Sequence, residues 1–547
     1  MIEDKKDNII YLDGKNLSIN DVINIAEKGY KVNYKEEVWG KIGVFRKGLE
    51  NQLNKRPDLK IYGVNVGCGD LKDSEINPES FEEYQENLII SHNCGTGNPI
   101  AVEIVRAIMV IRLNSFAKGY SAIRPETCKL MIDMLNRGVT PWVLEEGSVG
   151  ASGDLVPLAM IGAVLIGIFN AKAYYEDKLV SAPDALRKAG LKPIKLGARE
   201  ALALTNGTNF MAALALFALR DTQILLKSAS ISVALSLETI RGEKDAFSEF
   251  IANARPHKGQ VEIAAQIRKL LEGSKRTTVE AQKNKFSDSK YFEDNLRGNV
   301  YETGKERIQD RYSFRAVPQV HGAVFEAVEK LKEVVSIEIN SATDNPLIFQ
   351  ENGMYKAQSA ANFHGQPLAV VIDYLKIALT GLALITNKRT FSLLDKFQSY
   401  GLPQALAANP KDGNTGLMIT QYAGAARAAE SRILSTPASV MSIATAANQE
   451  DFVSMGSIGA LHLRKIVYNT QIVISIELLC ALRGLQMTYN LLPKNLSRLG
   501  RGTNRVYYFF NNLLPPADKD RYLRIDMENV INIVKSGDLV RTVNNIL

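Results

Sequence analysis

The tripeptide Ala151-Ser152-Gly153 can become an electrophile without any added cofactor. The backbone nitrogen of Gly153 can attack the carbonyl carbon of Ala151 and close a five-membered ring. Loss of two waters then leaves an imidazolone in which the former serine carries an exocyclic methylene. Glycine suits the attacking position, because a side chain there would crowd the closure. The product is an electron-poor carbon that can accept an amine, which no ordinary side chain supplies.

Two plainer interpretations compete with this chemistry. Ser152-Gly153 could form an ordinary turn before a buried helix that starts near Leu155. The segment could also be a serine nucleophile elbow, which requires the pattern Gly-x-Ser-x-Gly. Gly150-Ala151-Ser152 begins that pattern, but Asp154 stands where the last glycine belongs. The segment alone does not distinguish an electrophile precursor from an ordinary turn. The polar clusters elsewhere in the chain supply the evidence for that choice.

Several further polar clusters stand between apolar stretches. Tyr62 opens a glycine-rich loop, Tyr62 to Gly69, which can present the phenol but lacks the G-K-[ST] or G-x-G-x-x-G pattern of a phosphate site. Glu430 interrupts an apolar stretch, so its carboxylate must be paired or must hold a ligand. Taken singly, each cluster is typical of a turn, a satisfied histidine or an ion pair. The others are Ser91 to Gly97, Asn206-Gly207-Thr208, Gln309 to Arg315, Asn362 to Gln366 and Asn448 to Asp451.

The elements that must position these clusters follow a helical period. Residues 322–342 carry an apolar stripe at helical spacing with Glu and Lys opposite it, which predicts an amphipathic helix. Long apolar stretches at 368–397 and 455–487 predict helices that pack in a bundle or against another subunit. Residues 101–118 and 155–171 predict shorter buried helices.

Strand signals are few, chiefly near 60–66 and 347–355, and the polar stretch from Ser274 to Arg307 predicts an excursion between helices. We therefore expect a mainly α protein in two parts. Residues 1–225 would form a smaller N-terminal part that carries Ala-Ser-Gly, and residues 226–547 a long-helix bundle with oligomerisation helices.

Composition excludes several classes of function. The 547 residues are 46% hydrophobic and 23% charged with a net charge of +7, and the basic stretches are interspersed with acids, so no nucleic-acid partner is expected. Four separated cysteines without a C-x-x-C pattern indicate neither a metal site nor a disulfide framework and fit a reducing cytoplasm. The charged N-terminus lacks the apolar core of a signal peptide, and no stretch predicts a membrane partner.

Taken together and in order, the clusters from Tyr62 to Met455 resemble the aromatic amino-acid ammonia-lyases and 2,3-aminomutases. This family includes histidine, tyrosine and phenylalanine ammonia-lyases. The most specific shared element is the segment Gly147 to Leu155, supported by the other clusters and by Asn340 to Pro346. The resemblance implies a long-helix bundle of the fumarase/aspartase-like ammonia-lyase type and a homotetramer whose sites are built from three subunits. It also implies a 4-methylidene-imidazol-5-one (MIO) group made from Ala151-Ser152-Gly153, with no external cofactor.

The resemblance assigns chemical roles to the catalytic residues. The methylene derived from Ser152 would take the substrate amine and make it a better leaving group. Tyr62 matches the family's catalytic base, so the site must favour phenolate although tyrosine ordinarily titrates at about 10. Helix N-termini that point at the centre would supply positive potential. Tyr312 matches a second active-site tyrosine, and Asp154 would assist ring closure.

The remaining matches concern binding. Arg315 would clamp the substrate carboxylate, while Asn206 and Gln309 would hydrogen-bond the imidazolone or that carboxylate. Phe363 would pack beside the substrate ring, and Gln449 would lie near the MIO group.

The identity of the substrate ring stays open. Ser91 and His92 match the positions that face the ring, and they offer hydrogen bonds to a phenol or an imidazole, which disfavours phenylalanine. Glu430 matches the carboxylate that binds imidazole in histidine ammonia-lyases. Two features lean instead towards the tyrosine lyase and aminomutase branch, with histidine close behind. One is the pair of segments Ala361 to Pro367 and Ser399 to Pro403, and the other is the long polar insert before Gln309.

Two alternatives accompany this hypothesis. A tyrosine 2,3-aminomutase would use the same residues and return ammonia to the β-carbon. An inactive helical scaffold would be expected to lose Tyr62, Arg315 or the Ala-Ser-Gly tripeptide, and all are present. The chain also departs from the family pattern: Val66 and Cys68 replace the Thr and Phe that are common after Tyr62.

Overall fold

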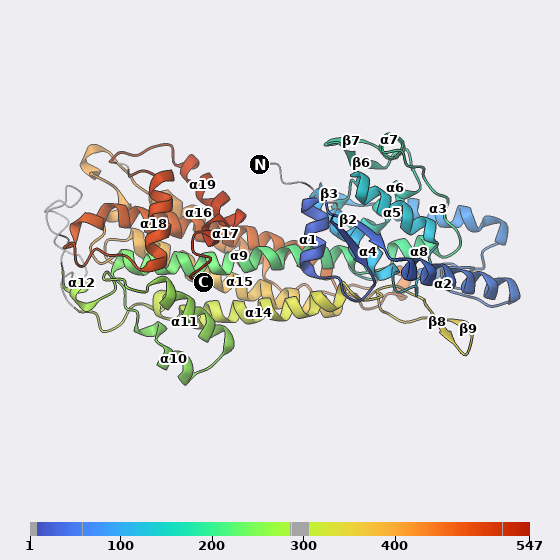
Figure 1. Ribbon diagram of the computed structural model, residues 1–547, viewed down its shortest axis with the longest axis horizontal. Helices are drawn as coiled ribbons and strands as arrows, with labels where there is room; N and C mark the ends of the chain where they lie inside the picture. The colour runs from blue at the N-terminus through green and yellow to red at the C-terminus, as the bar shows by residue number, and fades with distance from the viewer. Residues whose placement is uncertain (1–7, 57, 285, 287–305, 517) are drawn as a thin grey trace. The chain divides into compact units, whose positions relative to one another are not determined.

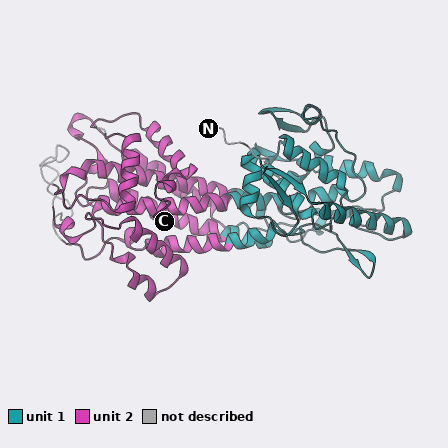
Figure 2. Cartoon of the chain, in the orientation of Figure 1, with its two compact units in different colours: residues 1–217, 331–373, 437–461 teal, residues 218–330, 374–436, 462–547 magenta. Residues whose placement is uncertain are grey.

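The structure is a computed structural model that describes residues 8–56, 58–284, 286, 306–516 and 518–547. The chain divides into two compact units (Figure 2). Unit 1 comprises residues 1–217, 331–373 and 437–461, and unit 2 comprises residues 218–330, 374–436 and 462–547. The predicted N-terminal part, 1–225, corresponds to the first segment of unit 1. Unit 1 also takes two later segments, because the long helices start or end in it.

Unit 1 is built mainly from helices with short strand pairs at its edges (Figure 1). Its helices are α1 (Ile19–Lys28), α2 (Glu36–Lys55), α3 (Phe81–Ser91), α4 (Val102–Phe116), α5 (Pro125–Arg137), α6 (Leu155–Leu165), α7 (Ala182–Lys188) and α8 (Glu200–Thr205), with 3-10 turns η1 (Gly69–Leu71), η2 (Pro78–Ser80) and η7 (Ala446–Asn448). Its strands are β1 (Ile9–Leu12), β2 (Lys31–Tyr34), β3 (Thr96–Pro99), β4 (Thr140–Pro141), β5 (Leu144–Glu146), β6 (Lys172–Tyr175), β7 (Lys178–Ser181), β8 (Leu347–Glu351) and β9 (Met354–Gln358).

The strands form small separate sheets. Strands β1 and β2 pair in parallel, with Ile9 opposite Lys31, and β3 pairs antiparallel with β5. Strands β4, β6 and β7 form an antiparallel sheet, and β8–β9 is a hairpin with Leu347 opposite Gln358. The buried core of unit 1 is helical. Nearly every residue of α4 and α6 is buried, which confirms the buried helices predicted at 101–118 and 155–171.

Four long helices contribute residues to both units within the described chain: α9 (Asn209–Ile240), α14 (Val317–Glu338), α15 (Gln366–Leu394) and α17 (Gly456–Thr488). They confirm the predicted helices at 322–342, 368–397 and 455–487. The other elements of unit 2 are η3 (Asp245–Phe247), α10 (Glu249–Ala254), α11 (Lys258–Leu270), α12 (Val279–Lys283), α13 (Tyr312–Arg315), η5 (Gln404–Leu406), η6 (Pro410–Asp412), α16 (Met418–Leu434), η8 (Tyr489–Leu491), α18 (Arg501–Leu513), α19 (Leu523–Ser536) and α20 (Asp538–Arg541).

Within unit 2, α9, α15 and α17 run side by side around a buried charge cluster (Figure 1). Glu477 of α17 forms an ion pair with Arg389 of α15 at 2.6 Å and accepts a hydrogen bond from Ser236 of α9 at 2.8 Å. Both charged side chains are fully buried, and each compensates the other's desolvation. The cluster thereby connects three helices through a single carboxylate.

Helices α9, α15 and α17 are long and apolar enough to cross a membrane by length and composition alone. Their apolar windows are 78%, 61% and 89% buried inside the folded chain. Most of this apolar surface is therefore used for packing within the protein.

Two predictions need comment. The strand predicted near residues 60–66 is wrong, since this segment forms a closed loop with only isolated bridges. The Asn65 side chain explains the loop, because it accepts from the Ile61 backbone N–H and donates to the Leu59 carbonyl, both at 2.8 Å. The excursion predicted from Ser274 to Arg307 lies largely outside the described residues; α12 is the helix described within it.

Candidate active site

The Ala151–Gly153 segment lies in unit 1 between β5 and α6, on a backbone that depends on glycine. Gly150 and Gly153 have φ values of 66° and 71°, which glycine adopts without strain. A Cβ on Gly153 would collide with the backbone of Gly207. The Asp154 N–H donates to the Gly207 carbonyl at 2.7 Å. The tripeptide therefore packs against the Asn206–Thr208 cluster through a close contact between Gly153 and Gly207, which a larger residue at position 153 could not make.

Asn206 holds the serine of the tripeptide. Its Nδ2 donates to the Ser152 carbonyl oxygen at 2.7 Å and to the Ser152 hydroxyl oxygen at 2.8 Å. Both residues are buried, at 1% and 8% exposure. Ring closure would remove the hydroxyl as water and keep the carbonyl oxygen on the ring. Asn206 Nδ2 already donates a hydrogen bond to both oxygens. The residues present therefore fit an imidazolone at this position.

Asp154 is fully buried directly beside the tripeptide. It accepts hydrogen bonds from the Ser148 hydroxyl at 3.0 Å, the Ser457 hydroxyl at 2.5 Å and the Met211 backbone N–H at 3.0 Å. Burial raises the pKa of this carboxyl to about 6, although these donors partly oppose the shift. Asp154 thus ties the loop to residues at the start of α9 and α17.

Three helices begin around the tripeptide. Helix α6 follows it directly in the chain, α9 starts just after Asn206–Thr208, and α17 starts just after Ser454. The Ser454 hydroxyl donates to the Gly150 carbonyl at 3.1 Å. Since helix N-termini carry partial positive charge, the segment lies in a region that favours developing negative charge. This agrees with the expected arrangement of helix N-termini.

A cavity of about 260 Å³ opens against the tripeptide. That is somewhat below the ~300–1,000 Å³ of drug-sized ligand sites, as suits a single amino acid. It is lined by Ser91, His92, Cys94, Gly147, Ser148, Val149, Ala151, Gly153, Leu155, Val156, Thr445 and Glu450. The structure therefore brings Ser91 and His92, at the end of α3, to the same cavity as the electrophile precursor.

The lining of this cavity includes an imidazole and a carboxylate. Burial lowers the pKa of His92 below its usual value despite the nearby Glu450, so the ring is neutral at neutral pH. The His92 Nδ1 lies 3.2 Å from the Ser91 hydroxyl. Glu450 accepts from the Thr445 hydroxyl at 2.7 Å. Together these groups can both accept and donate hydrogen bonds in the cavity.

Glu450 is a polar residue of the cavity that the sequence analysis did not single out. It belongs to the polar cluster Asn448 to Asp451, which was the available signal. Ala446, Ala447 and Asn448 all have positive φ, and this compact turn presents Glu450 to the cavity while the neighbouring Gln449 is exposed.

Tyr62 lies in the loop before η1, close enough to Glu450 to feel its charge but not among the residues that line the cavity. Its hydroxyl oxygen accepts from the Gly69 N–H at 2.8 Å, and η1 packs beside η7. Burial, followed by the effect of Cys68, raises the pKa of Tyr62 to about 12, and the charge of Glu450 acts in the same direction. Phe363 is half-buried, in a segment whose Gly365 packs tightly on Met211 and Ser454.

The other predicted residues belong to unit 2. Tyr312 is 72% exposed, Gln309 is exposed, and the Arg315 guanidinium lies 4.4 Å from the centre of the Tyr312 ring. The Nε of Arg315 is buried with no hydrogen-bond partner among the described residues. The Arg315 guanidinium and the Tyr312 ring therefore lie together, with one guanidinium nitrogen unpartnered in the described part of the chain.

Glu430, also in unit 2, lies on α16 in a cationic environment. It pairs with Arg427 at 3.2 Å and Lys465 at 3.8 Å and accepts from Asn469 at 2.8 Å. Partial burial raises the pKa of Glu430, but these partners outweigh it and the pKa is lowered overall. The cavity beside Ala151–Gly153 is lined by Glu450 and not by Glu430.

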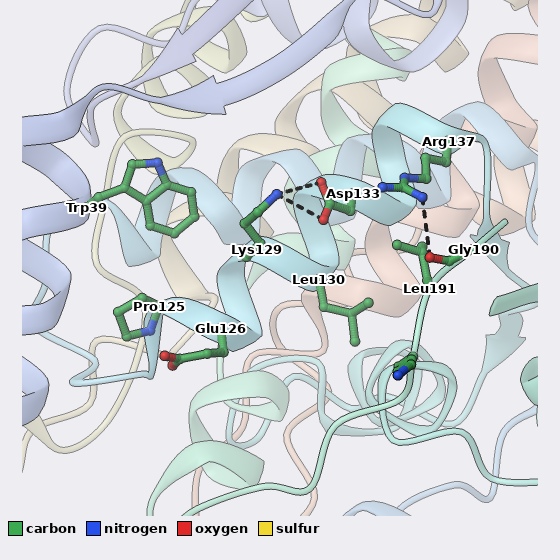
Figure 3. Close-up of a pocket in the computed structure, with 10 residues that line it drawn as sticks. Trp39, Pro125, Glu126, Lys129, Leu130, Asp133, Arg137, Gly190 and Leu191 are labelled. Carbon is green, nitrogen blue, oxygen red and sulfur yellow. Dashed lines mark hydrogen bonds and ion pairs between the residues drawn. The ribbon is translucent and has the colours of Figure 1, made fainter. Parts of the chain in front are cut away.

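A second groove in unit 1, of about 450 Å³, lies along α5 (Figure 3). Its lining includes Trp39, the Lys129–Asp133 ion pair and Arg137, which donates to the Ala189 carbonyl. None of the predicted site residues lines it, so the smaller cavity is the candidate active site.

Known proteins with similar sequence and structure identify the family of this chain. The family model described as "Aromatic amino acid lyase" matches residues 17–511. The chain is 42% identical over 540 residues to "Histidine ammonia-lyase 2" of Fusobacterium nucleatum, covering 98% of this chain and 99% of the relative. It is 39% identical over 529 residues to the histidine ammonia-lyase of Caldanaerobacter subterraneus, covering 96% and 97%.

Solved structures give the same result. The tyrosine aminomutase of Streptomyces globisporus matches with a TM-score of 0.87 at 31% identity, covering 98% of this chain and 99% of that one. The histidine ammonia-lyase of Trypanosoma cruzi matches with a TM-score of 0.85 at 32% identity, covering 98% and 96%. These matches confirm the predicted fold class and the predicted enzyme class. The chain belongs to the aromatic amino acid lyase family and is a carbon–nitrogen lyase that eliminates ammonia from an aromatic amino acid.

Proposed function

We propose that the substrate is L-histidine, which the enzyme converts to urocanate and ammonia. The observation that carries this proposal is that His92 and Glu450 both line the cavity beside Ala151–Gly153. A substrate imidazole has one ring nitrogen that donates and one that accepts. The Glu450 carboxylate can accept the ring N–H, and the Ser91–His92 pair can serve the other nitrogen. The similarity to histidine ammonia-lyases supports the same choice.

In this proposal Glu450 replaces Glu430 as the carboxylate that binds the ring. Glu430 already has two cationic partners and an amide donor, whereas the hydrogen bond assigned to the Glu450 carboxylate comes from Thr445. A carboxylate oxygen accepts more than one hydrogen bond, so Glu450 keeps capacity for a ligand.

We infer that Ala151-Ser152-Gly153 matures into the MIO group. When formed, that group supplies an electrophilic carbon that binds the substrate amine and makes it a better leaving group. The chain's own residues do the rest. Asn206 donates to the Ser152 carbonyl oxygen, and Tyr62 removes the β-proton of the substrate. Phe363 packs beside the ring, Gln449 lies near the group, and the surrounding helix N-termini stabilise negative charge.

We further infer a homotetramer in which Gln309, Tyr312 and Arg315 of one subunit complete the site of another. Arg315 would bind the substrate carboxylate in the bidentate manner of a guanidinium. The exposure of Tyr312 and the full exposure of Ile308, which precedes Gln309, support this, since such side chains are typical of interfaces. Exposed apolar residues on α15 and α16, among them Ile377, Tyr422 and Ile433, supply further contact surface.

The four free cysteines support a cytoplasmic location.

The test is to incubate the purified enzyme separately with histidine, tyrosine and phenylalanine. We expect ultraviolet absorbance of a conjugated acrylate to grow with histidine, and intact mass to be two waters below the sequence mass. Tyr62→Phe should retain the mass deficit and the fold but lose turnover. Full sequence mass in the wild type, or turnover of tyrosine in preference to histidine, would contradict the proposal.

The second candidate is a tyrosine 2,3-aminomutase, favoured by the structural similarity to tyrosine aminomutase. The Ser91–His92 pair could also accept a phenol hydroxyl. Analysis of the tyrosine incubation for a β-amino acid distinguishes this candidate from the lyase.

A further inference from the structure

A buried arginine of α4 packs against the turn that carries Asn206. Arg112 is 1% exposed. Its Nη2 donates to the carbonyl oxygen of Ala203, before Asn206, and its Nη1 donates to the Asn209 Oδ1, after Asn206, at 3.3 Å. A Cβ added to Gly207 would collide with the same Nη1. The guanidinium therefore contacts the chain before, within and after the turn.

The local structure explains why this turn needs a partner from another element. Ala203 lies in the last turn of α8, and Asn209 is the first residue of α9. The last carbonyl groups of a helix have no partner within that helix, and glycine at position 207 leaves the backbone of the turn permissive. A guanidinium presents several donors in a fixed planar arrangement. One side chain can therefore bind both helix ends and restrict the turn between them.

The distances around Asp344 show that a second arginine is its nearer counter-ion. Arg199 Nη2 lies 3.0 Å from Asp344 Oδ2, whereas Arg112 Nη2 lies 3.9 Å from the same oxygen. All three side chains are buried. A buried cation loses its hydration at a large cost in free energy, so the hydrogen bonds from Arg112 to Ala203 and Asn209 have to compensate part of that cost. Removal of Arg112 would also leave Asp344 with its closer partner.

The turn itself binds the tripeptide at two points. Asn206 Nδ2 donates to both oxygens of Ser152, at 2.7 Å and 2.8 Å, and the Gly207 carbonyl accepts from the Asp154 N–H at 2.7 Å. A shift of the turn would change these contacts together. A displacement of about 1 Å in a catalytic arrangement can cost about 100-fold in rate. The residue that fixes the turn therefore affects the chemistry at Ser152 without contacting it.

We propose that Arg112 is a positioning residue for Asn206. By binding Ala203 and Asn209, it keeps the Asn206 Nδ2 at hydrogen-bonding distance from Ser152 while the ring forms and during turnover. Arg112 acts through Asn206 and transfers no proton. This inference rests on the proposed maturation of the tripeptide and adds a residue of α4 to it.

The first experiment measures intact mass and steady-state kinetics with histidine in Arg112→Lys. Lysine keeps the positive charge but lacks the planar fork that binds two acceptors. We expect kcat and kcat/KM to fall by the same factor, about 10- to 100-fold, and more chains to retain the full sequence mass. The matched control is Arg106→Lys, which should keep the wild-type kcat and mass deficit. Arg106 is also buried on α4, but it donates to the carbonyl groups of Ile25, Ala26 and Leu135, away from the turn.

A merely structural role would lower the yield or the melting temperature of Arg112→Lys and Arg106→Lys alike, without a separate effect on kcat in the folded protein. Wild-type kcat and mass deficit in folded Arg112→Lys would overturn the proposal. An equal fall of kcat in Arg106→Lys would also overturn it.

Asn209→Ala keeps the proposal testable if Arg112→Lys does not fold. It removes one acceptor of the guanidinium and leaves the arginine in place. Loss of one hydrogen bond to a charged group changes an equilibrium by about tenfold, so kcat should fall by about tenfold with KM unchanged. Where both single variants fold, the loss in the double variant should be smaller than the product of the single losses. Wild-type kcat in Asn209→Ala, or fully multiplicative losses, would overturn the proposal.

The second experiment is independent of ring formation and of lyase activity. Ser152→Ala blocks the ring, and amide hydrogen exchange is followed by mass spectrometry in this protein, in Ser152→Ala/Arg112→Lys and in the control Ser152→Ala/Arg106→Lys. Local opening exposes amides to exchange. Peptides that contain residues 203–211 or the Asp154 N–H should therefore exchange about tenfold faster in Ser152→Ala/Arg112→Lys than in the other two proteins.

The two experiments separate the positioning role from the proposed function. Unchanged exchange in Ser152→Ala/Arg112→Lys would overturn the positioning role even if the wild-type enzyme is active. Faster exchange in that variant, together with full sequence mass in the wild type, would leave the positioning role intact and refute the proposed maturation.

Discussion

Asn206 donates from one atom, Nδ2, to both oxygens of Ser152, 2.7 Å from the carbonyl oxygen and 2.8 Å from the hydroxyl. The same nitrogen therefore serves the oxygen that ring closure would expel and the oxygen that the ring would retain. The Asn206 Oδ1 is buried without a hydrogen-bond partner in the described part of the chain. Such a group is costly to bury alone and is available to a ligand.

Asn206→Ala should lower kcat by at least about 100-fold, the typical effect of removing one donor from a site of developing negative charge. Steady-state assay with histidine provides the measurement. Asn33→Ala, at an exposed position of β2, is the control and should retain wild-type kcat. A loss below about tenfold in Asn206→Ala would mean that the two hydrogen bonds are structural only.

The pH dependence of turnover should be alkaline. Burial raises the pKa of Tyr62 to about 12, so only a small fraction of this base is ionised at neutral pH, and that fraction grows tenfold with each pH unit. We expect kcat at saturating histidine to rise with pH from about 7 to about 10. A flat profile across this interval would show that Tyr62 is not the group whose ionisation limits the reaction.

The ring specificity should depend on Glu450. Glu450→Gln removes the charge that, in the proposed function, binds the substrate imidazole, and it leaves a similar shape, so kcat/KM for histidine should fall by about 100-fold. Activity on tyrosine should fall less. Glu83→Gln on the exposed side of α3 is the matched control. An equal loss in Glu430→Gln with no loss in Glu450→Gln would return the ring-binding role to Glu430.

Asp154 should give stability a recognisable pH dependence. Its pKa is raised to about 6 in the folded chain from about 3.9 in an unfolded one. Below the lower value both states hold the proton and the contribution to stability is complete. Between the two values the unfolded state loses its proton first, so the free energy of unfolding falls as pH rises through about 6, by about 3 kcal/mol in total.

The measurement compares melting temperatures of Ser152→Ala and Ser152→Ala/Asp154→Asn between about pH 4 and about pH 7. The alanine prevents ring formation in both proteins, and other carboxyl groups contribute equally to both. The difference between the two curves should therefore isolate Asp154. Parallel curves would show that folding does not raise the pKa of this carboxyl.

Mixing two inactive variants tests whether subunits share sites. Tyr62→Phe carries its defect in unit 1 and Arg315→Ala in unit 2. If these residues come from different subunits, a mixed oligomer contains some sites in which both are intact. Co-expression should then recover about a quarter of wild-type activity for random assembly. No recovery in a mixed oligomer, verified by mass, would place both residues in one subunit's site.

Much of this protein was determined by local sequence. The glycines around Ser152, the apolar period of the long helices and the order of the polar clusters were sufficient to predict the electrophile precursor, the helical class and the family. These features depend on backbone geometry and on side chains close together in the chain, which the sequence displays directly. The loop at Asn65 was not predicted. Side-chain hydrogen bonds from Asn65 to the backbone override the strand-like composition of this segment.

The tertiary structure decided which carboxylate lines the cavity beside Ala151–Gly153. Glu430 and Glu450 both follow apolar stretches, and nothing local distinguishes them. Packing brings Glu450 to the end of α3, beside His92, and leaves Glu430 among cations on α16. The sequence likewise did not predict the contact between Tyr84 and Cys68. Contacts between distant segments depend on how whole elements pack, and no short stretch of sequence contains that information.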